Sequence, residues 1–443
     1  MPRPRKDRIF GPDIRIPSRA FPSTLASVVF KRWDSICGGS YETPPCPSRI
    51  ALRTLIETAY LAGSAPDEER FPQFNIVATP VEETGEKQRI GHVWPFDTRR
   101  SLTVSELRKL APAVDLKKSA IWAVWSKSEW QIAGLVDLGT SWHRARMGLE
   151  YNYNDPKCLL LQVDRPGRLR VYQGSFHVAT LTDGAIEGHE GISLHLSLHE
   201  PANRGLDAMA KELKRPKIES YREYYGFEFL ALWNTYAAIA NSMAQLRHGG
   251  ALIILPSKSK PSAALTKIKY AQETSILRAA FISCMNARHV IGDLIAESEN
   301  NQADAEEYPL SPGAELKFRS TFAELIEATR FVAQLSGCDG AILISDDLKL
   351  FGFGAEIKAE MRKNCHVYEA VDDYDEMNRK YRRLDLEQFG MRHRSAIKLI
   401  SHARDARALV ISQDGPITAI WKQEDKVIVR KGVNLVNMNM PWA

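Results

Sequence analysis

The stretch Asp339-Gly340-Ala341-Ile342-Leu343-Ile344-Ser345 joins an acidic residue and a glycine to a short apolar run. Such a run, next to turn residues, is typical of a strand that is buried on both faces of a sheet. A helical pattern over Ser320–Leu335 leads into it, and an earlier helix leads into a second apolar run, Gly249–Pro256. Because helices alternate with buried strands, the carboxyl half is predicted to be an α/β domain.

The amino-terminal half has a different pattern, of short strands separated by turns such as Arg165–Arg168. Before these strands, the spacing of apolar residues from Ile50 to Tyr60 predicts one helix. The half is therefore expected to be a sheet-rich α+β domain. Its predicted strands are Phe74–Thr79, Ala120–Trp125, Trp130–Val136, Cys158–Val163, Leu169–Tyr172 and His177–Leu181.

A break in pattern at Glu200–Gly205 separates the two halves and is predicted to be the linker between domains. At 443 residues the chain is long enough for two domains. We therefore expect three parts: a basic, flexible tail at 1–22, an amino-terminal domain at 23–205, and a carboxyl-terminal domain at 206–443.

The net charge of +5 comes almost entirely from residues 1–20, which hold six basic and two acidic residues. The rest of the chain is close to neutral. A broad nucleic-acid-binding surface is therefore not expected, although a local anion site remains possible. The tail itself is rich in proline, which favours a flexible lead-in, or an arm that lies on a neighbouring molecule, over a functional patch.

Neither a membrane span nor an export signal is expected. The longest apolar candidate, Phe227–Ala244, is interrupted by polar residues such as Asn234 and Asn241. The amino terminus lacks the apolar core of a signal peptide. Six scattered cysteines without CxxC spacing indicate reduced thiols. These features together predict a cytoplasmic protein.

The tripeptide Asp-Gly-Ala occurs twice, at 183–185 and 339–341, and its context separates the two copies. The first copy runs into a polar turn, whereas the second opens a strand that a sheet would bury. An acid at the lip of a buried strand is suited to holding a metal ion or a hydroxyl group, and the following glycine lets a ligand approach the backbone closely.

A second motif, Phe389-Gly390-Met391-Arg392-His393-Arg394-Ser395, stands at the start of a predicted helix, Met391–Ala403. Free backbone N–H groups and the helix dipole favour an anion at this end. Two arginines and a histidine oppose that dipole, so their clustering is better explained by a bound polyanion. A solvated basic turn is the alternative.

Together these segments resemble the diadenylate cyclase (DAC) family, in which an Asp-Gly-Ala strand and a downstream Gly-x-Arg-His-Arg helix flank ATP. The likeness covers most of residues 225–435, including Leu246–Ile254 and the segment 408–421. It implies a mixed sheet flanked by helices. The layout also resembles diadenylate cyclases with an amino-terminal sensor-like domain (a DACNV-like architecture), which would place the sensor at 23–205.

The resemblance implies that two ATP molecules are condensed into cyclic di-AMP and two pyrophosphates, with Mn or Mg as cofactor. Asp339 would bind the metal and the ribose 3′-hydroxyl, and Arg392, His393 and Arg394 would hold the phosphates. The further nucleotide-binding positions that it implies are Gly340, Ala341, Gly390, Ser395, Ser412 and Gln413. Ring closure needs two facing ATP molecules, so a homodimer or higher homo-oligomer of face-to-face DAC domains is expected.

The chain departs from the compact family core at the longer, charged segments 256–318 and 358–384, and at Cys338. A non-catalytic module that binds ATP or senses a cyclic dinucleotide therefore stays open as an alternative. A different nucleotide product also stays open, because the residues that select the base are not identified.

Two further patterns in the sequence carry less information. Residues 193–199 alternate in polarity and predict a strand with His195 and His199 on one face; at about 3.3 Å per residue the two are roughly 13 Å apart, too far to share a metal ion. Residues Leu107–Gly139 repeat the order of helix and strands in Leu325–Ile357, but without the acid or the Arg-His-Arg motif. The first domain is either a non-catalytic relative of the second or shares only its α/β texture.

Overall fold

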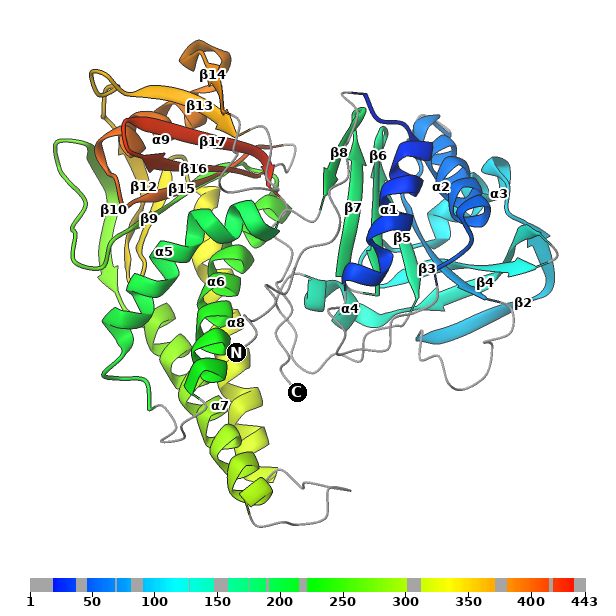
Figure 1. The fold of residues 1–443 in the computed structure, drawn as a ribbon, viewed down its shortest axis with the longest axis horizontal. Helices are drawn as coiled ribbons and strands as arrows, with labels where there is room; N and C mark the ends of the chain where they lie inside the picture. Colours follow the sequence, from blue (N-terminus) through cyan, green and yellow to red (C-terminus); the bar gives the residue numbers. More distant parts are fainter. Residues whose placement is uncertain are drawn as a thin grey trace, which may run out of the picture. The chain divides into compact units, whose positions relative to one another are not determined.

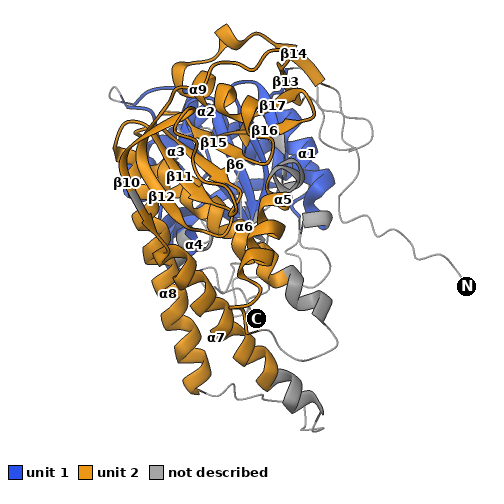
Figure 2. Ribbon diagram, turned by 90° about the vertical axis from the view of Figure 1, so that its left-hand side faces the viewer, with its two compact units in different colours: residues 1–146, 152–189, 443 blue, residues 147–151, 190–442 orange. Residues whose placement is uncertain are grey.

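The computed structural model contains two compact units, which divide between residues 188 and 191 (Figures 1 and 2). Each is an α/β structure with one mixed sheet and flanking helices, which confirms the predicted fold class. The structure describes residues 19–36, 46–67, 70–80, 91–126, 128–146, 158–174, 176–188, 191–214, 221–300, 312–370, 381–413 and 417–433. The predicted basic tail lies almost wholly outside these residues.

Unit 1 is built on an eight-stranded sheet in the order β2-β4-β3-β1-β5-β6-β7-β8. Helices α1, α2 and α3 cover one face, and α4 packs against the other. Its elements are α1 (Pro22–Ile36), α2 (Arg49–Ser64), β1 (Phe74–Pro80), β2 (His92–Ser101), α3 (Val104–Leu110), β3 (Ser119–Ser126), β4 (Glu129–Asp137), α4 (Gly139–Arg146), β5 (Leu159–Arg165), β6 (Arg168–Gln173), β7 (Phe176–Thr182) and β8 (Ala185–Gly188).

Unit 2 is built on a nine-stranded sheet in the order β10-β12-β11-β9-β15-β16-β17-β13-β14. Its elements are α5 (Gly191–Met209), α6 (Tyr221–Leu246), β9 (Gly250–Leu255), β10 (Thr266–Thr274), α7 (Ile276–Asn300), α8 (Pro312–Gln334), β11 (Ala341–Ser345), β12 (Leu350–Ile357), β13 (His366–Ala370), β14 (Tyr381–Leu384), α9 (Met391–His402), β15 (Arg407–Ile411), β16 (Ile417–Gln423) and β17 (Lys426–Val433), with a short 3-10 turn η4 (Leu386–Gln388) before α9.

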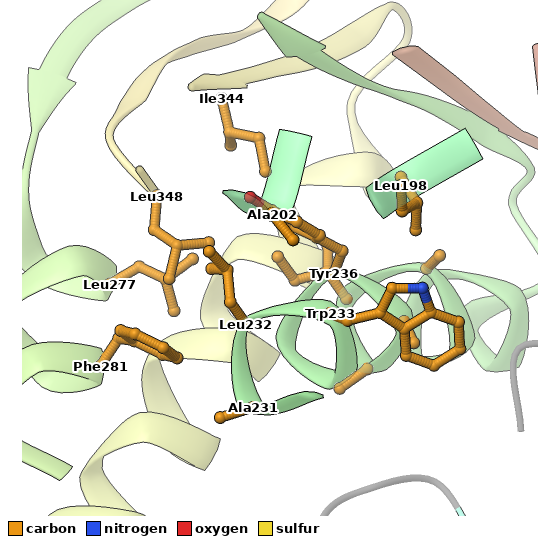
Figure 3. Packing of buried hydrophobic residues seen from close by; sticks show 14 of the residues in the cluster. Leu198, Ala202, Ala231, Leu232, Trp233, Tyr236, Leu277, Phe281, Ile344 and Leu348 are labelled. Carbon is orange, nitrogen blue, oxygen red and sulfur yellow. The ribbon is translucent and has the colours of Figure 1, made fainter. Parts of the chain in front are cut away.

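The central strands of unit 2 are buried on both faces, as their unbroken apolar runs predict. Helices α5, α6, α7 and α8 pack on one face through a large core. Trp233 and Tyr236 of α6 are fully buried in this core, which also contains Leu198 of α5 and Phe281 of α7 (Figure 3). Helix α9 covers the other face, where Ala396, Ile397 and similar residues pack against β9, β15 and β17.

The segments 256–318 and 358–384 are longer than the corresponding parts of the compact family core and were expected to be insertions. Both contain regular elements of unit 2. The first holds the edge strand β10 and helix α7, which packs along α8 (Figure 1). The second holds the hairpin β13–β14 at the opposite edge of the sheet. Residues 301–311 and 371–380 lie outside the described residues.

Two predictions fail at α5. Residues 193–199 were expected to be a strand, and Glu200–Gly205 a linker, but both lie in this helix. The alternation of leucines before residue 198 imitates a strand, whereas the buried residues that follow (Leu198, Ala202, Leu206 and Met209) recur at helical spacing and pack in the core of unit 2.

Contacts on the strand ends hold α5 in unit 2. Arg204 forms a 2.9 Å ion pair with the buried Asp346, directly after β11. A Cβ on Gly205 would lie 2.0 Å from the Asp346 carbonyl oxygen, so only glycine fits there. Glu200 pairs with Arg407 of β15 at 2.7 Å. The predicted linker is therefore a packed helix, and the units divide about fifteen residues earlier than the predicted 205/206 boundary.

Candidate functional site

The candidate site lies at one end of the unit 2 sheet. Strands β9 and β11 run parallel and begin at this end, and the antiparallel β15 finishes there, as the pairing of Ala251 with Ala341 and with Val410 shows. Helix α9 begins next to the same strand ends. Segments that are about 140 residues apart in the chain are thus brought together by the sheet.

Gly249 is the point where three of these segments meet. Its φ of +67° is in the left-handed region. A Cβ at this position would lie 2.9 Å from Nη1 of Arg392, 3.1 Å from the Ile411 carbonyl oxygen and 3.3 Å from Cγ of Gln413. Arg392 and Gln413 therefore lie side by side, and a side chain at residue 249 would displace one of them.

Asp339 and Arg392 face each other across this end of the sheet. Their closest atoms, Oδ1 and Nη2, are 4.0 Å apart, and the side chains are 106% and 42% exposed. At this distance and exposure the pair contributes little to stability. Both charged groups are therefore accessible to a ligand, and they carry opposite charges within one contact distance.

The packing of the sheet by itself accounts for the residue types at Gly340 and Ala341. Gly340 has a φ of +120°, and a Cβ there would lie 2.5 Å from the carbonyl carbon of Gly354 in β12. The Ala341 side chain is buried on the face of the sheet that α9 covers. Of these two positions, only the backbone of Gly340 remains accessible to a nucleotide.

Gly390 precedes the first turn of α9 and has an extended conformation, with φ −63° and ψ 163°. No described side chain caps this end of the helix. Helix N–H groups without an intrahelical partner are available to an anion here. Ser395, one turn further, is half-buried, and Ser412 after β15 is also half-buried.

His393 is directed toward β16 and β17. Its Nε2 lies 3.1 Å from Oγ1 of Thr418, and its ring stacks at 6.1 Å on Phe389. Burial, and then the charge of Lys431, lower the pKa of His393 below its ordinary value. At neutral pH the imidazole is therefore uncharged, which makes it a hydrogen-bonding group and not a third cation.

Arg394 is held by a carboxylate from the preceding turn. Its Nη1 forms a 2.7 Å ion pair with Glu387 of η4, and the two side chains are 37% and 74% exposed. A phosphate at Arg394 would have to share the guanidinium with Glu387. Arg392 is therefore the arginine of this motif that the geometry favours most as a phosphate ligand.

Gly249, Thr418 and Lys431 were not predicted from the sequence as members of the site. The doublet Gly249-Gly250 was a usable signal, because adjacent glycines before a buried strand mark a close approach of backbone. Thr418 and Lys431 lie in ordinary strand sequence, and nothing local distinguishes them.

Asp339 is the single carboxylate in the predicted motif, and the described residues contain no group of three or more potential metal ligands. Magnesium in nucleotide enzymes is often held by one or two carboxylates together with substrate phosphates. The donor set therefore fits a metal ion that arrives with a nucleotide, with Asp339 as its protein ligand.

The sequence of unit 1 matches a family model described as "Probable sensor domain DACNV" over residues 41–137. This sensor family occurs in diadenylate cyclases. Comparisons with curated proteins and with solved structures give no match. In the part of the chain that the structure describes, no helix is long and apolar enough to cross a membrane. Residues 41–137 of the chain are thus similar to a probable sensor domain of a type that occurs in diadenylate cyclases.

Proposed function

We propose that unit 2 is a diadenylate cyclase, which condenses two ATP molecules into cyclic di-AMP and two pyrophosphates. The observation that carries the proposal is the meeting of Arg392 and Gln413 at Gly249, with Asp339 at 4.0 Å from the same arginine. These residues come from motifs whose likeness to the family was noted in sequence alone. They converge on one accessible corner of the sheet, where β9 and β11 begin and β15 ends. This convergence supports a common ligand.

The reaction joins the 3′-oxygen of one ATP to the α-phosphorus of a second ATP. The bond from the α-phosphorus to the bridging oxygen breaks, pyrophosphate leaves with the electron pair, and the hydroxyl proton passes to water. Such a step requires alignment and neutralisation of charge, and no covalent nucleophile. A bound divalent ion would supply charge neutralisation at Asp339.

The residues of unit 2 would have separate roles in this step. Arg392, beside Asp339, would bind phosphate, and the start of α9 would add backbone N–H donors. His393, uncharged and fixed by Thr418, would donate or accept a hydrogen bond without adding charge. The open backbone at Gly249 and Gly340 would let the nucleoside lie close to the sheet.

Because one corner holds one ATP, two copies of unit 2 must face each other to close the ring. We propose a homodimer or higher homo-oligomer that brings two such corners together. Activity per protomer should then rise with protein concentration until the dimer is saturated. Full activity of a strictly monomeric protein at nanomolar concentration would refute this arrangement.

Unit 1 is proposed to control synthesis, and its match to the sensor family supports this role. A separate compact unit with its own core can respond to a ligand and alter its neighbour.

The activity is tested by incubating the full-length protein with each of the four NTPs and with Mn or Mg, and identifying the products by mass spectrometry. Cyclic di-AMP and pyrophosphate from ATP are expected. Binding of ATP without any product would instead favour the non-catalytic module, and a different cyclic product would reassign the base.

A further inference from the structure

The candidate site continues along the sheet beyond the residues of the two motifs. The ends of five neighbouring strands, in the order β11-β9-β15-β16-β17, lie at this end of the sheet. They carry Asp339, Gly249, Gln413, Thr418 and Lys431, in the same order. Neighbouring strands are about 4.8 Å apart, so the row spans roughly 19 Å. This is longer than a nucleoside monophosphate needs and is comparable with an extended nucleoside triphosphate.

Lys431 stands at the far end of this row from Asp339. Its Nζ lies 4.9 Å from the centre of the Phe389 ring and 4.0 Å from Oε1 of Glu369. The side chain is 49% exposed, and Glu369 makes a closer ion pair with Arg382. The ammonium group is therefore positioned by an aromatic ring and a distant carboxylate, and remains accessible to another anion.

The phosphate-binding end of α9 lies between the two ends of the row. Phe389, over which Lys431 lies, comes directly before Gly390 and the first turn of α9. Lys431 also lies close enough to His393 for its charge to lower the pKa of that imidazole. Going along the row from Asp339, a ligand would meet Arg392 first, then the His393–Thr418 pair, and then Lys431.

We propose that Lys431 is a further substrate-binding residue, which contacts the β- and γ-phosphates of ATP, the part that leaves as pyrophosphate. The inference rests on the proposed function, because that function places the nucleoside at Asp339. Negative charge grows on the pyrophosphate as its bond to the α-phosphorus breaks. A cation at this point would stabilise the transition state more than bound ATP.

The test measures the affinity of the full-length Lys431→Gln variant for ATP, AMP and inorganic tripolyphosphate by calorimetry with Mg. A lost charge-assisted contact should weaken ATP and tripolyphosphate about tenfold, while AMP binding stays unchanged. Lys431→Arg should keep most of the affinity. Lys426→Gln is the matched control, because Lys426 lies on the same strand with its Nζ over the rings of Tyr368 and Tyr381. This control should bind all three ligands as wild type does.

A second readout reports position directly. Removing the charge of Lys431 should raise the pKa of His393, followed by NMR, while Lys426→Gln should not. The inference is overturned if Lys431→Gln binds ATP as wild type does, or if AMP binding falls as much as ATP binding. If wild type binds neither ATP nor tripolyphosphate, the proposed function is lost together with the inference. Tripolyphosphate binding that depends on Lys431, in a protein that makes no cyclic product, supports the phosphate site and rejects the cyclase.

Discussion

The sheets of the two units follow the same order over seven strands. β2-β4-β3-β1-β5-β6-β7 in unit 1 corresponds to β10-β12-β11-β9-β15-β16-β17 in unit 2. In both, the third and fourth strands of this order, β3 with β1 and β11 with β9, pair in parallel, and the other neighbouring pairs are antiparallel. Two helices precede each path, and a helix before the final strands covers the opposite face.

One glycine in each sheet occupies an equivalent position, so the two sheets can be superposed residue by residue. A Cβ on Gly134 of β4 would lie 2.2 Å from the Trp94 carbonyl oxygen, and one on Gly352 of β12 would lie 2.4 Å from that of Tyr270. Both glycines allow the edge strand to approach. With them superposed, Lys118 and Ser119 fall at the positions of Asp339 and Gly340.

The corner that is open in unit 2 is filled in unit 1. Asn75 and Gln162 take the positions of Ala251 and Val410. Nδ2 of Asn75 donates to the carbonyl oxygens of Ser119 (2.8 Å) and Leu116 (3.2 Å), and Nε2 of Gln162 donates to Oδ1 of Asn75 at 2.9 Å. These bonds fasten the loop before β3 over the sheet end, where unit 2 exposes Asp339.

Ion pairs strengthen this closed corner. Asp164, at the position of Ser412, pairs with Arg168 at 2.7 Å and with Arg170 at 2.6 Å. The same arrangement of strands can therefore end in exposed charged side chains, as in unit 2, or in a closed polar network, as in unit 1, and a few side chains at the strand ends decide which. The shared strand order favours the interpretation that unit 1 is a relative of unit 2, and not merely similar to it in α/β texture.

The largest effect is expected at Asp339. Asp339→Asn removes the single carboxylate of the motif and should abolish product formation while leaving the fold intact, measured by mass spectrometry and circular dichroism. Asp183→Asn, in the other Asp-Gly-Ala copy, is the control; its ion pair with Arg165 is exposed, so activity should not change. Turnover within a few fold of wild type in Asp339→Asn would show that the metal assignment is wrong.

Arg392→Ala should lower kcat/KM for ATP roughly tenfold to hundredfold, because a charge-assisted phosphate contact is lost. Arg394→Ala should cost less, since Glu387 already occupies that guanidinium. Steady-state kinetics at several ATP concentrations distinguish the two. Equal losses at both positions would mean that Glu387 releases Arg394 when ATP binds.

In unit 1, Asp164→Asn should destabilise the closed corner without touching ATP use. Burial opposes the charge of Asp164, but Arg170 and Arg168 outweigh it and hold its pKa below the ordinary value. Removing the largely buried carboxylate that Arg168 and Arg170 share should cost about 3 kcal/mol at neutral pH. Hydrogen exchange should quicken in unit 1 and not in unit 2, and Asp183→Asn serves again as the control.

The same variant has a pH signature. A carboxyl group with a lowered pKa in the folded state contributes stability above its unfolded pKa of about 3.9, and this contribution is lost as pH falls through the folded pKa. The stability gap between wild type and Asp164→Asn should therefore be constant near neutral pH and shrink in acid. A gap that persists unchanged in acid would mean that Asp164 acts through packing.

The smallest effect is expected from removing unit 1. A fragment from residue 191 keeps α5 with its contacts to Asp346 and Arg407, so it should fold and bind ATP as the full chain does. Its turnover should differ from that of the full chain, faster if unit 1 hinders dimer formation and slower if it supports it. A fragment from residue 206 loses both ion pairs and should be less stable. A folded 191–443 fragment that cannot bind ATP would place part of the site in unit 1.

Several features could be predicted from the amino-acid sequence because they depend on neighbours in the chain. Apolar runs predicted β1, β9, β11 and β15, and helical spacing predicted α6 and α9, within a few residues. The end of α8 was also predicted, but its start was placed at Ser320, eight residues after Pro312. The Asp-Gly-Ala and Arg-His-Arg motifs could also be found in the sequence, because each is a contiguous run of residues. The order of helix and strands in Leu107–Gly139 and Leu325–Ile357 already indicated a shared pattern, although the sequence left a chance resemblance open.

Tertiary structure alone decided how these pieces meet. The neighbours Gly249 and Arg392 are 143 positions apart, and only the pairing of β9 between β11 and β15 brings them together. Helix α5 was misjudged because its leucines alternate locally, while burial against distant strands selects the helical face. Lys431 lies in the row of site residues because β17 finishes at the same end of the sheet as β15. Local patterns select helices and strands, whereas long-range burial and strand pairing select which side chains share a site.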